Sequence, residues 1–278
     1  MNIRRIGRML GIALLLLVII IFVVIRFAEQ KMIFFPTVFP GGYWDTSFFP
    51  GQIEDCSFRA EDGVVLHGWF AHAISSNIRP RRTLLFFHGN AGNITHRQTN
   101  IAYLIQRGLN VFIFDYRGYG KSEGKPSEQG VYADAVAAYE YLAARKDVQP
   151  EHIMFFGRSL GGAVAIELAT RKPCEKLIVE STFTSIQDMA REIVGPIPVH
   201  FLLRSRFDSL SKIGTIHTPL LIIHGNQDTI IPFEHGKRLF AAANVPKFFY
   251  EIQGADHNNT YELGGTAYFN RLTTFIYE

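Results

Sequence analysis

The chain has 278 residues, of which 47% are hydrophobic and 13% aromatic. This length and composition allow one large domain with a sizeable core, and they exclude an intrinsically disordered protein. The net charge of +3 is unevenly distributed: residues 1–31 contain five basic side chains and one acidic side chain, so residues 32–278 sum to −1. A nearly neutral body without a basic run excludes the usual kind of nucleic-acid-binding surface.

The N-terminal segment predicts a membrane anchor. Residues 9–25 form an uninterrupted run of 17 apolar residues and glycines between Arg8 and Arg26. At about 1.5 Å per residue the run reaches roughly 25 Å, the short end of the length that crosses a bilayer. A cleaved signal peptide is the main alternative, but Arg26 stands where cleavage would need a small residue. We therefore expect an anchor over residues 1–31, with its helix over about 9–25.

The charges that flank this run predict an orientation. Arg4, Arg5 and Arg8 precede the run together with the α-amino group, whereas Arg26 and Lys31 follow it. Cytoplasmic ends of membrane helices carry the excess of positive charge. We therefore expect a single-pass membrane protein with a cytoplasmic N-terminus and an exported catalytic domain, which in a bacterium would lie in the periplasm.

The residues after the anchor predict a collar and then a folded domain. Residues 32–52 are rich in Phe, Pro and Gly, and their prolines discourage regular structure. We expect an irregular collar that packs the domain near the bilayer, followed by the domain itself over residues 53–278. The first element of that domain is expected to be a hairpin over residues 56–71 that turns at Glu61-Asp62-Gly63.

From residue 83 onward, short apolar runs alternate with helical stretches. Apolar runs without polar alternation are typical of strands buried on both faces, so the pattern predicts an α/β fold with a mostly parallel sheet covered by helices on both faces. The expected strands are residues 83–88, 111–115, 153–156, 177–180, 220–224 and 248–252. The expected helices lie near residues 96–107, 127–146, 160–171, 233–243 and 262–277. Residues 184–217 interrupt this alternation of strands and helices, and they predict a small helical lid.

The motif that indicates chemistry is G-R-S-L-G-G at residues 157–162. It directly follows an expected strand and directly precedes a helix of small residues, which is the context of a nucleophile elbow in an α/β-hydrolase. Side chains at positions 157 and 161 would collide with neighbouring backbone in such a turn. We predict that Ser159 is the nucleophile and that the next helix directs its N-terminus toward the position where negative charge develops.

A serine nucleophile needs a general base and an acid that orients the base, and on this fold they follow in the order serine, acid, histidine. His257 lies in the loop after the last expected strand, and Asp228 lies in the loop after the strand before it. Both loops leave the carboxyl ends of parallel strands, the edge that also carries Ser159, so the three residues can converge. Glu180, at the end of an earlier strand, remains an alternative acid. Asp256 is disfavoured because neighbouring side chains rarely face each other.

The oxyanion hole is expected to combine the backbone N–H of Leu160 with one from the loop after the strand at 83–88, whose sequence is H-G-N-A-G-N. Asn90 is the expected second donor, with Ala91 as the alternative. Apolar side chains of the lid and of the neighbouring strand end are expected to line a substrate pocket, namely Phe183, Met189 and Ile193. A fatty-acyl chain fits such a surface beside a bilayer, although the same side chains could equally serve to pack the lid.

The remaining reactive side chains carry weaker signals. Cys56 and Cys174 are far apart in the sequence, and no Cys/His cluster suggests a metal site. Both cysteines are expected to be ordinary buried thiols. His88 and His224 end strands just before glycines and are expected to be structural. No metal and no cofactor is expected.

The sequence resembles the Bem46-type branch of the α/β-hydrolases, which includes membrane-associated depalmitoylases of eukaryotes and bacterial proteins. The resemblance covers about residues 55–275. Its matching stretches include HGNAGN at 88–93, DYRGYGKSEGKPSE at 115–128, GRSLGG at 157–162 and GADH at 254–257. The resemblance implies Ser159, Asp228 and His257 as the catalytic triad and weakens the case for Glu180, but it does not identify the substrate.

These observations together predict a membrane-anchored serine hydrolase that cleaves a carboxylic ester or thioester through an acyl-enzyme intermediate. The substrate is expected to be a small molecule or an acylated molecule. Two alternatives stay open at this point. One is a serine peptidase that acts on short peptides, and the other is a membrane-bound binding module that has lost catalysis.

Overall fold

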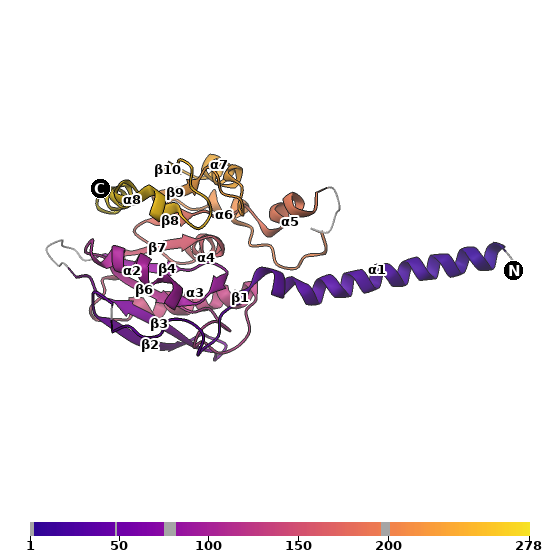
Figure 1. Cartoon of the computed structure of the whole chain (residues 1–278), viewed down its shortest axis with the longest axis horizontal. Helices are drawn as coiled ribbons and strands as arrows, with labels where there is room; N and C mark the ends of the chain where they lie inside the picture. Colours follow the sequence, from indigo (N-terminus) through magenta and orange to yellow (C-terminus); the bar gives the residue numbers. More distant parts are fainter. Residues whose placement is uncertain (1–2, 48, 75–81, 196–200) are drawn as a thin grey trace.

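The structure is a computed structural model that describes residues 3–47, 49–74, 82–195 and 201–278. Its centre is one eight-stranded sheet (Figure 1). The order of strands across this sheet is β10 (Lys247–Ile252), β9 (Leu220–Gly225), β8 (Leu177–Glu180), β7 (Ile153–Arg158), β4 (Thr83–Phe87), β6 (Asn110–Phe114), β3 (Val65–Ala71) and β2 (Ile53–Arg59). The strands from β10 to β6 in this order run parallel, whereas β3 pairs antiparallel with both β6 and β2.

The parallel strands are apolar at every position because helices cover both faces of the sheet. In β4, Leu84 and Phe86 face one core, whereas Leu85 and Phe87 face the other. One core is covered by α2 (Gln98–Ile105) and α8 (Thr260–Tyr277). The other is covered by α3 (Glu128–Ala143), α4 (Leu160–Ala169), α6 (Ser209–Ile213) and α7 (Phe233–Ala242).

The predicted parallel sheet with helices on both faces is therefore confirmed. Each of the six strands predicted from residue 83 onward is present, with its ends displaced by two residues at most, and the predicted hairpin is formed by β2 and β3 but begins three residues earlier, at Ile53. The helix predicted over residues 96–107 is divided into a 3₁₀ turn, η1 (Ile94–Arg97), and α2. The last predicted helix is also interrupted, because Gly265 in α8 has a φ of 49° and bends the helix there.

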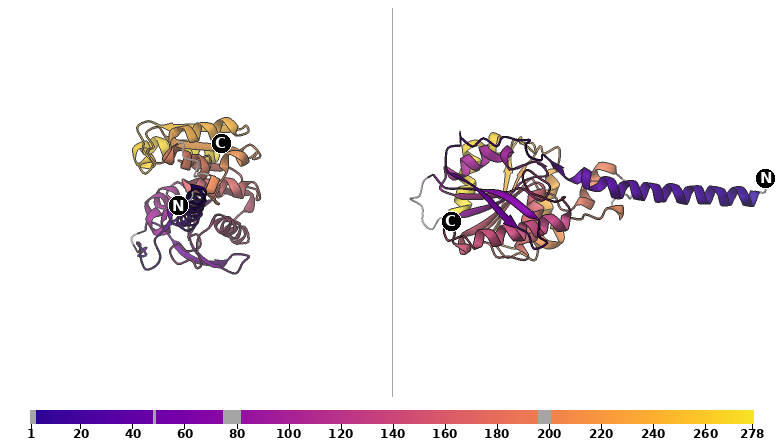
Figure 2. Two further views of the ribbon diagram at one scale, coloured as in Figure 1. Left: turned by 90° about the vertical axis from the view of Figure 1, so that its right-hand side faces the viewer. Right: turned by 90° about the horizontal axis from the view of Figure 1, so that it is seen from below.

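The N-terminal helix is longer than predicted. α1 covers Ile3–Ile33, whereas the apolar run predicts an end at residue 25. Residues 28–32 are A-E-Q-K-M, all good helix formers, so the helix continues beyond the apolar run. α1 extends away from the domain as a rod (Figures 1 and 2). Many of its large apolar side chains between Met9 and Val24 are exposed. Among the described residues, no helix combines the length and the apolar character that crossing a membrane requires.

The last turns of α1 are attached to the domain. Glu29 is buried, and its carboxylate accepts hydrogen bonds from the backbone N–H groups of Arg204 and Ser205. Just beyond the helix, Phe34 packs edge-on against Phe207, with ring centroids 6.2 Å apart. The end of the helix is thus part of the domain, whereas the rest of it stands free.

The collar predicted over residues 32–52 contains one regular element. β1 (Phe35–Pro36) pairs in parallel with β5 (Ala91–Gly92), which lies in the loop after β4. Nearby, the Asn93 side chain donates hydrogen bonds to the carbonyl oxygens of Thr37 and Gly41. Residue 48 lies outside the described residues. The collar therefore holds the loop after β4 in place, a function that its irregular sequence did not indicate.

The region predicted as a lid, residues 184–217, contains α5 (Ile186–Val194) and α6, while residues 196–200 lie outside the described residues. α6 packs against α4 and α7 and so belongs to a layer of the domain. α5 lies at the end of the domain from which α1 extends (Figure 1). Between the two helices, Glu128 of α3 accepts hydrogen bonds from the N–H groups of Arg206 and Phe207, next to the pair bound by Glu29.

The two cysteines are both free thiols. Cys56 is buried, as predicted, whereas Cys174 is partly exposed. Burial raises the pKa of both thiols, which keeps them in the unreactive protonated form at neutral pH.

Candidate active site

Ser159 lies in a sharp turn between β7 and α4. Its φ of 56° belongs to a region that L residues rarely adopt, and backbone strain of this kind is concentrated at functional turns. The Ser159 N–H donates to the carbonyl of Glu180 over 2.8 Å, and the hydroxyl of Thr182 donates to the Ser159 carbonyl over 2.8 Å. These two bonds to the neighbouring strand and the loop after it hold the strained turn in place.

Two glycines make this turn possible. A Cβ at Gly161 would lie 2.0 Å from the carbonyl oxygen of Phe87, and a Cβ at Gly157 would lie 2.3 Å from the carbonyl oxygen of Gly161. Both contacts are with backbone, which cannot move away as a flexible side chain could. The predicted reason for the two glycines is therefore confirmed.

The three side chains predicted to be catalytic meet at the carboxyl edge of the sheet. His257 Nε2 lies 3.1 Å from Ser159 Oγ, and His257 Nδ1 lies 2.8 Å from Asp228 Oδ2. All three residues are largely buried. Asp256 is directed elsewhere, because its carboxylate accepts hydrogen bonds from the N–H and hydroxyl of Thr229. The arrangement can transfer a proton from the serine hydroxyl to the imidazole, with the aspartate fixing the tautomer.

The Asp228 carboxylate is held as an anion. Its Oδ1 accepts hydrogen bonds from the N–H groups of Ile230 and Ile231, at 3.0 and 2.7 Å. Burial raises the pKa of this carboxyl, but hydrogen bonds from His224, His257 and Ile231 outweigh burial and hold the pKa well below its usual range. His224 Nε2 lies 3.4 Å from Asp228 Oδ2 and 2.9 Å from the carbonyl oxygen of Ile231. His224, predicted to be structural, thus supports the aspartate and its loop directly.

Glu180, the alternative acid, does not contact the imidazole of His257. Its buried carboxylate accepts hydrogen bonds from the hydroxyls of Thr260 and Tyr268, and it lies 3.2 Å from Arg158 Nε. Arg158 in turn donates from Nη2 to the backbone carbonyl of His257. Glu180 therefore supports the position of the histidine loop through Arg158, which is a different role from orienting the imidazole ring.

The loop after β4 brings the predicted oxyanion donors beside the serine. Leu160 is the first residue of α4, so its N–H is one of the four that lack a partner inside the helix. Asn90 and Ala91 line the same cavity as Leu160. The Asn90 carbonyl accepts a hydrogen bond from the Phe35 N–H, and its side-chain amide donates to the carbonyl of Ile33. These bonds attach the oxyanion loop to β1 and to the end of α1.

The wall behind this loop is rigid. Asp115 Oδ1 accepts a hydrogen bond from the N–H of Ile94 over 2.9 Å. Gly120, whose φ is 48°, passes so close that a Cβ there would lie 1.9 Å from Asp115 Oδ2. His88 packs against Tyr116 with ring centroids 4.4 Å apart, and burial lowers the pKa of His88 to about 3. A neutral, fully buried His88 agrees with the structural role predicted for it.

A cavity of about 290 Å³ opens in front of Ser159. The three predicted pocket residues, Phe183, Met189 and Ile193, all line it. Met32 and Ile33, at the end of α1, line it too. Sequence reasoning missed these two residues because it ended the helix at residue 25 and assigned residues 32–52 to an irregular collar. The N-terminal helix therefore contributes to the wall of the candidate active site.

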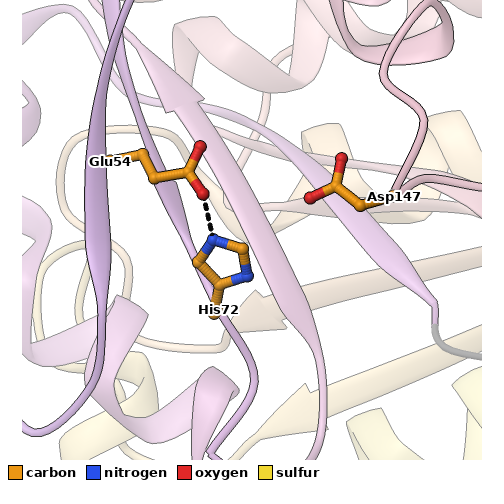
Figure 3. A group of neighbouring side chains, drawn as sticks. All are labelled: Glu54, His72 and Asp147. Carbon is orange, nitrogen blue, oxygen red and sulfur yellow. Dashed lines mark hydrogen bonds and ion pairs between the residues drawn. The ribbon is translucent and has the colours of Figure 1, made fainter.

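A second group of titratable side chains lies at the β2–β3 edge of the sheet. Glu54 and His72 are joined by a hydrogen bond, and Figure 3 shows the carboxylate of Asp147 pointing toward them. The Arg145 guanidinium donates to the carboxylates of Glu54 and Asp147, at 3.0 and 2.7 Å. This cation bridges the two carboxylates, so the group is an ion-pair cluster, and we assign it no metal.

Comparison with known proteins identifies the family. The chain is 36% identical over 250 residues to an uncharacterized protein of Mycobacterium tuberculosis, a match that covers 90% of this chain and 88% of that protein. It is also 36% identical over 271 residues to the alpha/beta hydrolase domain-containing protein WAV2 of Arabidopsis thaliana, covering 89% and 87% of the two chains. The chain belongs to the Bem46-like branch of the α/β-hydrolases.

This membership confirms the resemblance inferred from the motifs. Residues 78–212 also match the hydrolase family described as serine aminopeptidase, S33. Among solved structures, the esterase Pf2001 of Pyrococcus furiosus has a TM-score of 0.71 at 24% identity, covering 87% of this chain and 98% of that one. At this identity the match shows the fold alone, and it confirms the predicted α/β-hydrolase fold.

Proposed function

We propose that this protein is a serine hydrolase that cleaves a carboxylic ester or thioester. The observation that carries the proposal is the hydrogen-bonded chain from Ser159 through His257 to Asp228 beside a cavity. Ser159 Oγ attacks the carbonyl carbon of the substrate while His257 Nε2 takes the hydroxyl proton. Asp228 keeps the proton on His257 Nδ1 and stabilises the imidazolium that forms.

The later steps use the same residues. The oxyanion of the tetrahedral intermediate accepts hydrogen bonds from the N–H groups of Leu160 and Asn90, with Ala91 as the alternative to Asn90. When the intermediate collapses, the C–O or C–S bond breaks and His257 gives its proton to the leaving oxygen or sulfur. Water then attacks the acyl-enzyme with His257 as base, which releases the acid and restores Ser159. These steps require neither a metal nor a cofactor.

The lining of the cavity supports a fatty-acyl group as the apolar part of the substrate. Phe183, Ile186 and Met189 line it, and Met32 and Ile33 bring the end of α1 into the same lining. Moving a methylene group from water into such surroundings is worth about 0.8 kcal/mol, so longer acyl chains should bind more tightly. The cavity lies at the end of the domain from which α1 extends, where a membrane-borne acyl chain would approach.

We also propose that α1 attaches the protein to a membrane as a single-pass anchor, with a cytoplasmic N-terminus and an exported catalytic domain. Two observations support the attachment: the 17-residue apolar run at 9–25, and the exposure of side chains such as Leu15 and Ile20 on a helix that stands free of the domain. The excess of arginine before the run supports the orientation.

Fractionation tests the attachment and the orientation separately. The full chain should sediment with membranes and remain there in alkaline carbonate, which releases proteins bound only to the surface. Complete release by carbonate would contradict a spanning anchor. A protease added to the exported side should digest the domain, and digestion from the cytoplasmic side alone would contradict the proposed orientation.

A fluorophosphonate probe, which reacts with activated serines, tests the hydrolase proposal. The wild type should be labelled and Ser159→Ala should not, while Ser57→Ala, an exposed serine on β2, is the matched control and should label like the wild type. An unlabelled wild type would contradict the proposal and favour the inactive binding module.

Substrate preference then separates the enzymatic alternatives. We expect kcat/KM on p-nitrophenyl esters to rise with chain length between C2 and C16, and thioesters of the same acids to be cleaved as well. The family description as a serine aminopeptidase favours short peptides as the alternative substrate class. Faster cleavage of peptides than of any ester would contradict the esterase proposal.

A further inference from the structure

The cavity beside Ser159 has a cationic part that the proposed mechanism does not use. Arg97, the last residue of η1, and Arg158, the last residue of β7, both line it. Their guanidinium groups are close enough that the charge of Arg158 disfavours the charged form of Arg97. Two cations beside a nucleophile are unusual in a cavity whose remaining lining is largely apolar, so the partners of each arginine decide what this part of the cavity can bind.

Arg158 already has its partners within the protein. Its Nε lies 3.2 Å from the fully buried carboxylate of Glu180, and its Nη2 donates to the carbonyl oxygen of His257. Its charge is therefore balanced, and its position is fixed by the loop that it supports. A substrate would gain little from Arg158, because binding there would compete with Glu180.

Arg97 lacks such a balance. Its Nη2 donates to the carbonyl of Ala91 over 2.9 Å, but its Nε is buried without a hydrogen-bond partner, and in the described part of the chain no carboxylate forms an ion pair with it. Burial and the nearby Arg158 lower the pKa of Arg97 to about 10, so it is still a cation at neutral pH. Arg97 is half-buried at the wall of the cavity, so its cation is partly desolvated without an anion beside it, and an anionic ligand would offset that cost.

The position of Arg97 indicates which part of a substrate would contact it. Its hydrogen bond to Ala91 places the guanidinium beside the loop that supplies the second proposed oxyanion donor. The apolar lining comes from other segments, namely α1, α5 and the loops after β8 and β9. A substrate that uses both parts of the cavity would present an acyl chain to the apolar lining and a negative charge to Arg97.

We propose that Arg97 binds an anionic group, a carboxylate or a phosphate, on the leaving part of the substrate. The proposal rests on the esterase function proposed above and narrows it to acyl esters or thioesters of a negatively charged alcohol or thiol. Guanidinium suits this task because its planar N–H groups match the oxygens of carboxylate and phosphate.

A pair of esters with the same acyl chain tests the proposal. The charged substrate is 4-(butyryloxy)benzoate, and the neutral substrate is methyl 4-(butyryloxy)benzoate. The two differ by one negative charge on the leaving group. At low ionic strength the wild type should show a KM about tenfold lower for the charged ester, a ratio that corresponds to about 1.4 kcal/mol. Arg97→Gln should raise the KM of the charged ester to that of the neutral one, with little change in kcat, and Arg97→Lys should keep part of the preference.

Controls separate a local contact from a general effect of charge. Lys237→Gln removes one positive charge from the exposed side of α7 and should leave both KM values unchanged. Equal KM values for the two esters in the wild type would overturn the proposal, as would an equal rise for both in Arg97→Gln. Failure of the wild type to cleave either ester would instead contradict the hydrolase function itself.

The proposal can also be tested without a variant, in case Arg97→Gln does not fold. Free 4-hydroxybenzoate should inhibit cleavage of the neutral ester competitively, and more weakly as salt is added, whereas its methyl ester should inhibit far less. Equal inhibition by the two compounds would overturn the proposal. The butyryl ester of 4-hydroxyphenyl phosphate, assayed alongside, shows by its KM whether phosphate or carboxylate is the better anion for this site.

Discussion

The active site combines two regions that are constructed differently. The triad loops, residues 157–162, 224–231 and 254–260, leave parallel strands of the central sheet and are held by contacts along one edge of it. The N-terminal rim, residues 29–37 and 204–207, is joined by hydrogen bonds between segments far apart in the chain, such as Glu29 to Ser205. The chemistry is thus supported by the rigid core, whereas the shape of the cavity depends on how the end of α1 docks.

This difference leads to distinct expectations for the two regions. Changes in the triad loops should lower kcat for every substrate, because they alter groups that act on the reacting atoms. Changes in the N-terminal rim should raise KM for long acyl chains while sparing short ones, because they alter only the lining.

The largest effect is expected from removing the nucleophile. Ser159→Ala should lower kcat by about 10⁵-fold or more, with the residual rate coming from the oxyanion donors. Adding His257→Ala should cost little further, because the base then has no proton to take. Steady-state kinetics of both single variants and the double variant measure this directly. Losses that multiply in the double variant would show two independent supporting roles and would contradict a working triad.

The second-largest effect is expected from replacing the catalytic acid, Asp228. Asp228→Asn should lower kcat by about 10⁴-fold while the fold stays intact, because the histidine loses the partner that fixes its tautomer. Glu180→Gln is the control, since its carboxylate contacts Arg158, Thr260 and Tyr268 and not the imidazole of His257. We expect it to lower kcat far less. The reverse ranking, measured on the same ester, would place the catalytic acid at the end of β8.

The elbow glycine tests the rigidity of the triad loops. Gly161→Ala places a Cβ against the backbone of Phe87, so the protein should lose about 2–4 kcal/mol of unfolding free energy, together with most of its activity. Gly11→Ala is the matched control, because that glycine lies in α1 with open space around it. Thermal denaturation of both variants measures the difference. An unchanged melting temperature in Gly161→Ala would show that the elbow can relax.

The smallest effect is expected at the N-terminal rim. Glu29→Ala leaves the N–H groups of Arg204 and Ser205 without their acceptor, at a cost of about 1–3 kcal/mol that should loosen this segment locally. We expect KM for a C12 ester to rise a few-fold while kcat for an acetyl ester stays the same. Glu61→Ala, an exposed glutamate in the β2–β3 turn, is the control. An equal loss on both esters would contradict the separation of the two regions.

The triad loops could be predicted from the sequence because each follows a buried strand that shows as an apolar run. The G-x-S-x-G spacing then identified Ser159 as the candidate nucleophile. The order of the strands placed Asp228 and His257 at the same edge of the sheet as Ser159. Even so, the support that His224 gives to Asp228 was not visible, because a histidine at a strand end has no pattern that reveals its partner.

The N-terminal rim could not be predicted in this way. β1 has two residues, one of them a proline, and it pairs with a strand more than fifty residues away, so no local periodicity marks it. Glu29 looked like the polar end of an anchor, yet it is buried against the domain. Arg97 was missed for a similar reason, since a single arginine in a helical stretch does not indicate a cavity-lining cation that forms no ion pair among the described residues.

The hydrogen bonds that hold residues 204–207 have a consequence for how selectivity could evolve. Glu29 and Glu128 bind the backbone N–H groups of this segment, and every amino acid except proline supplies such a group. The segment therefore keeps its place whatever non-proline side chains it carries at 204 and 206, which are both exposed. Sequence change can thus accumulate beside the end of α1, which lines the cavity, without releasing the segment, and the catalytic residues stay the same.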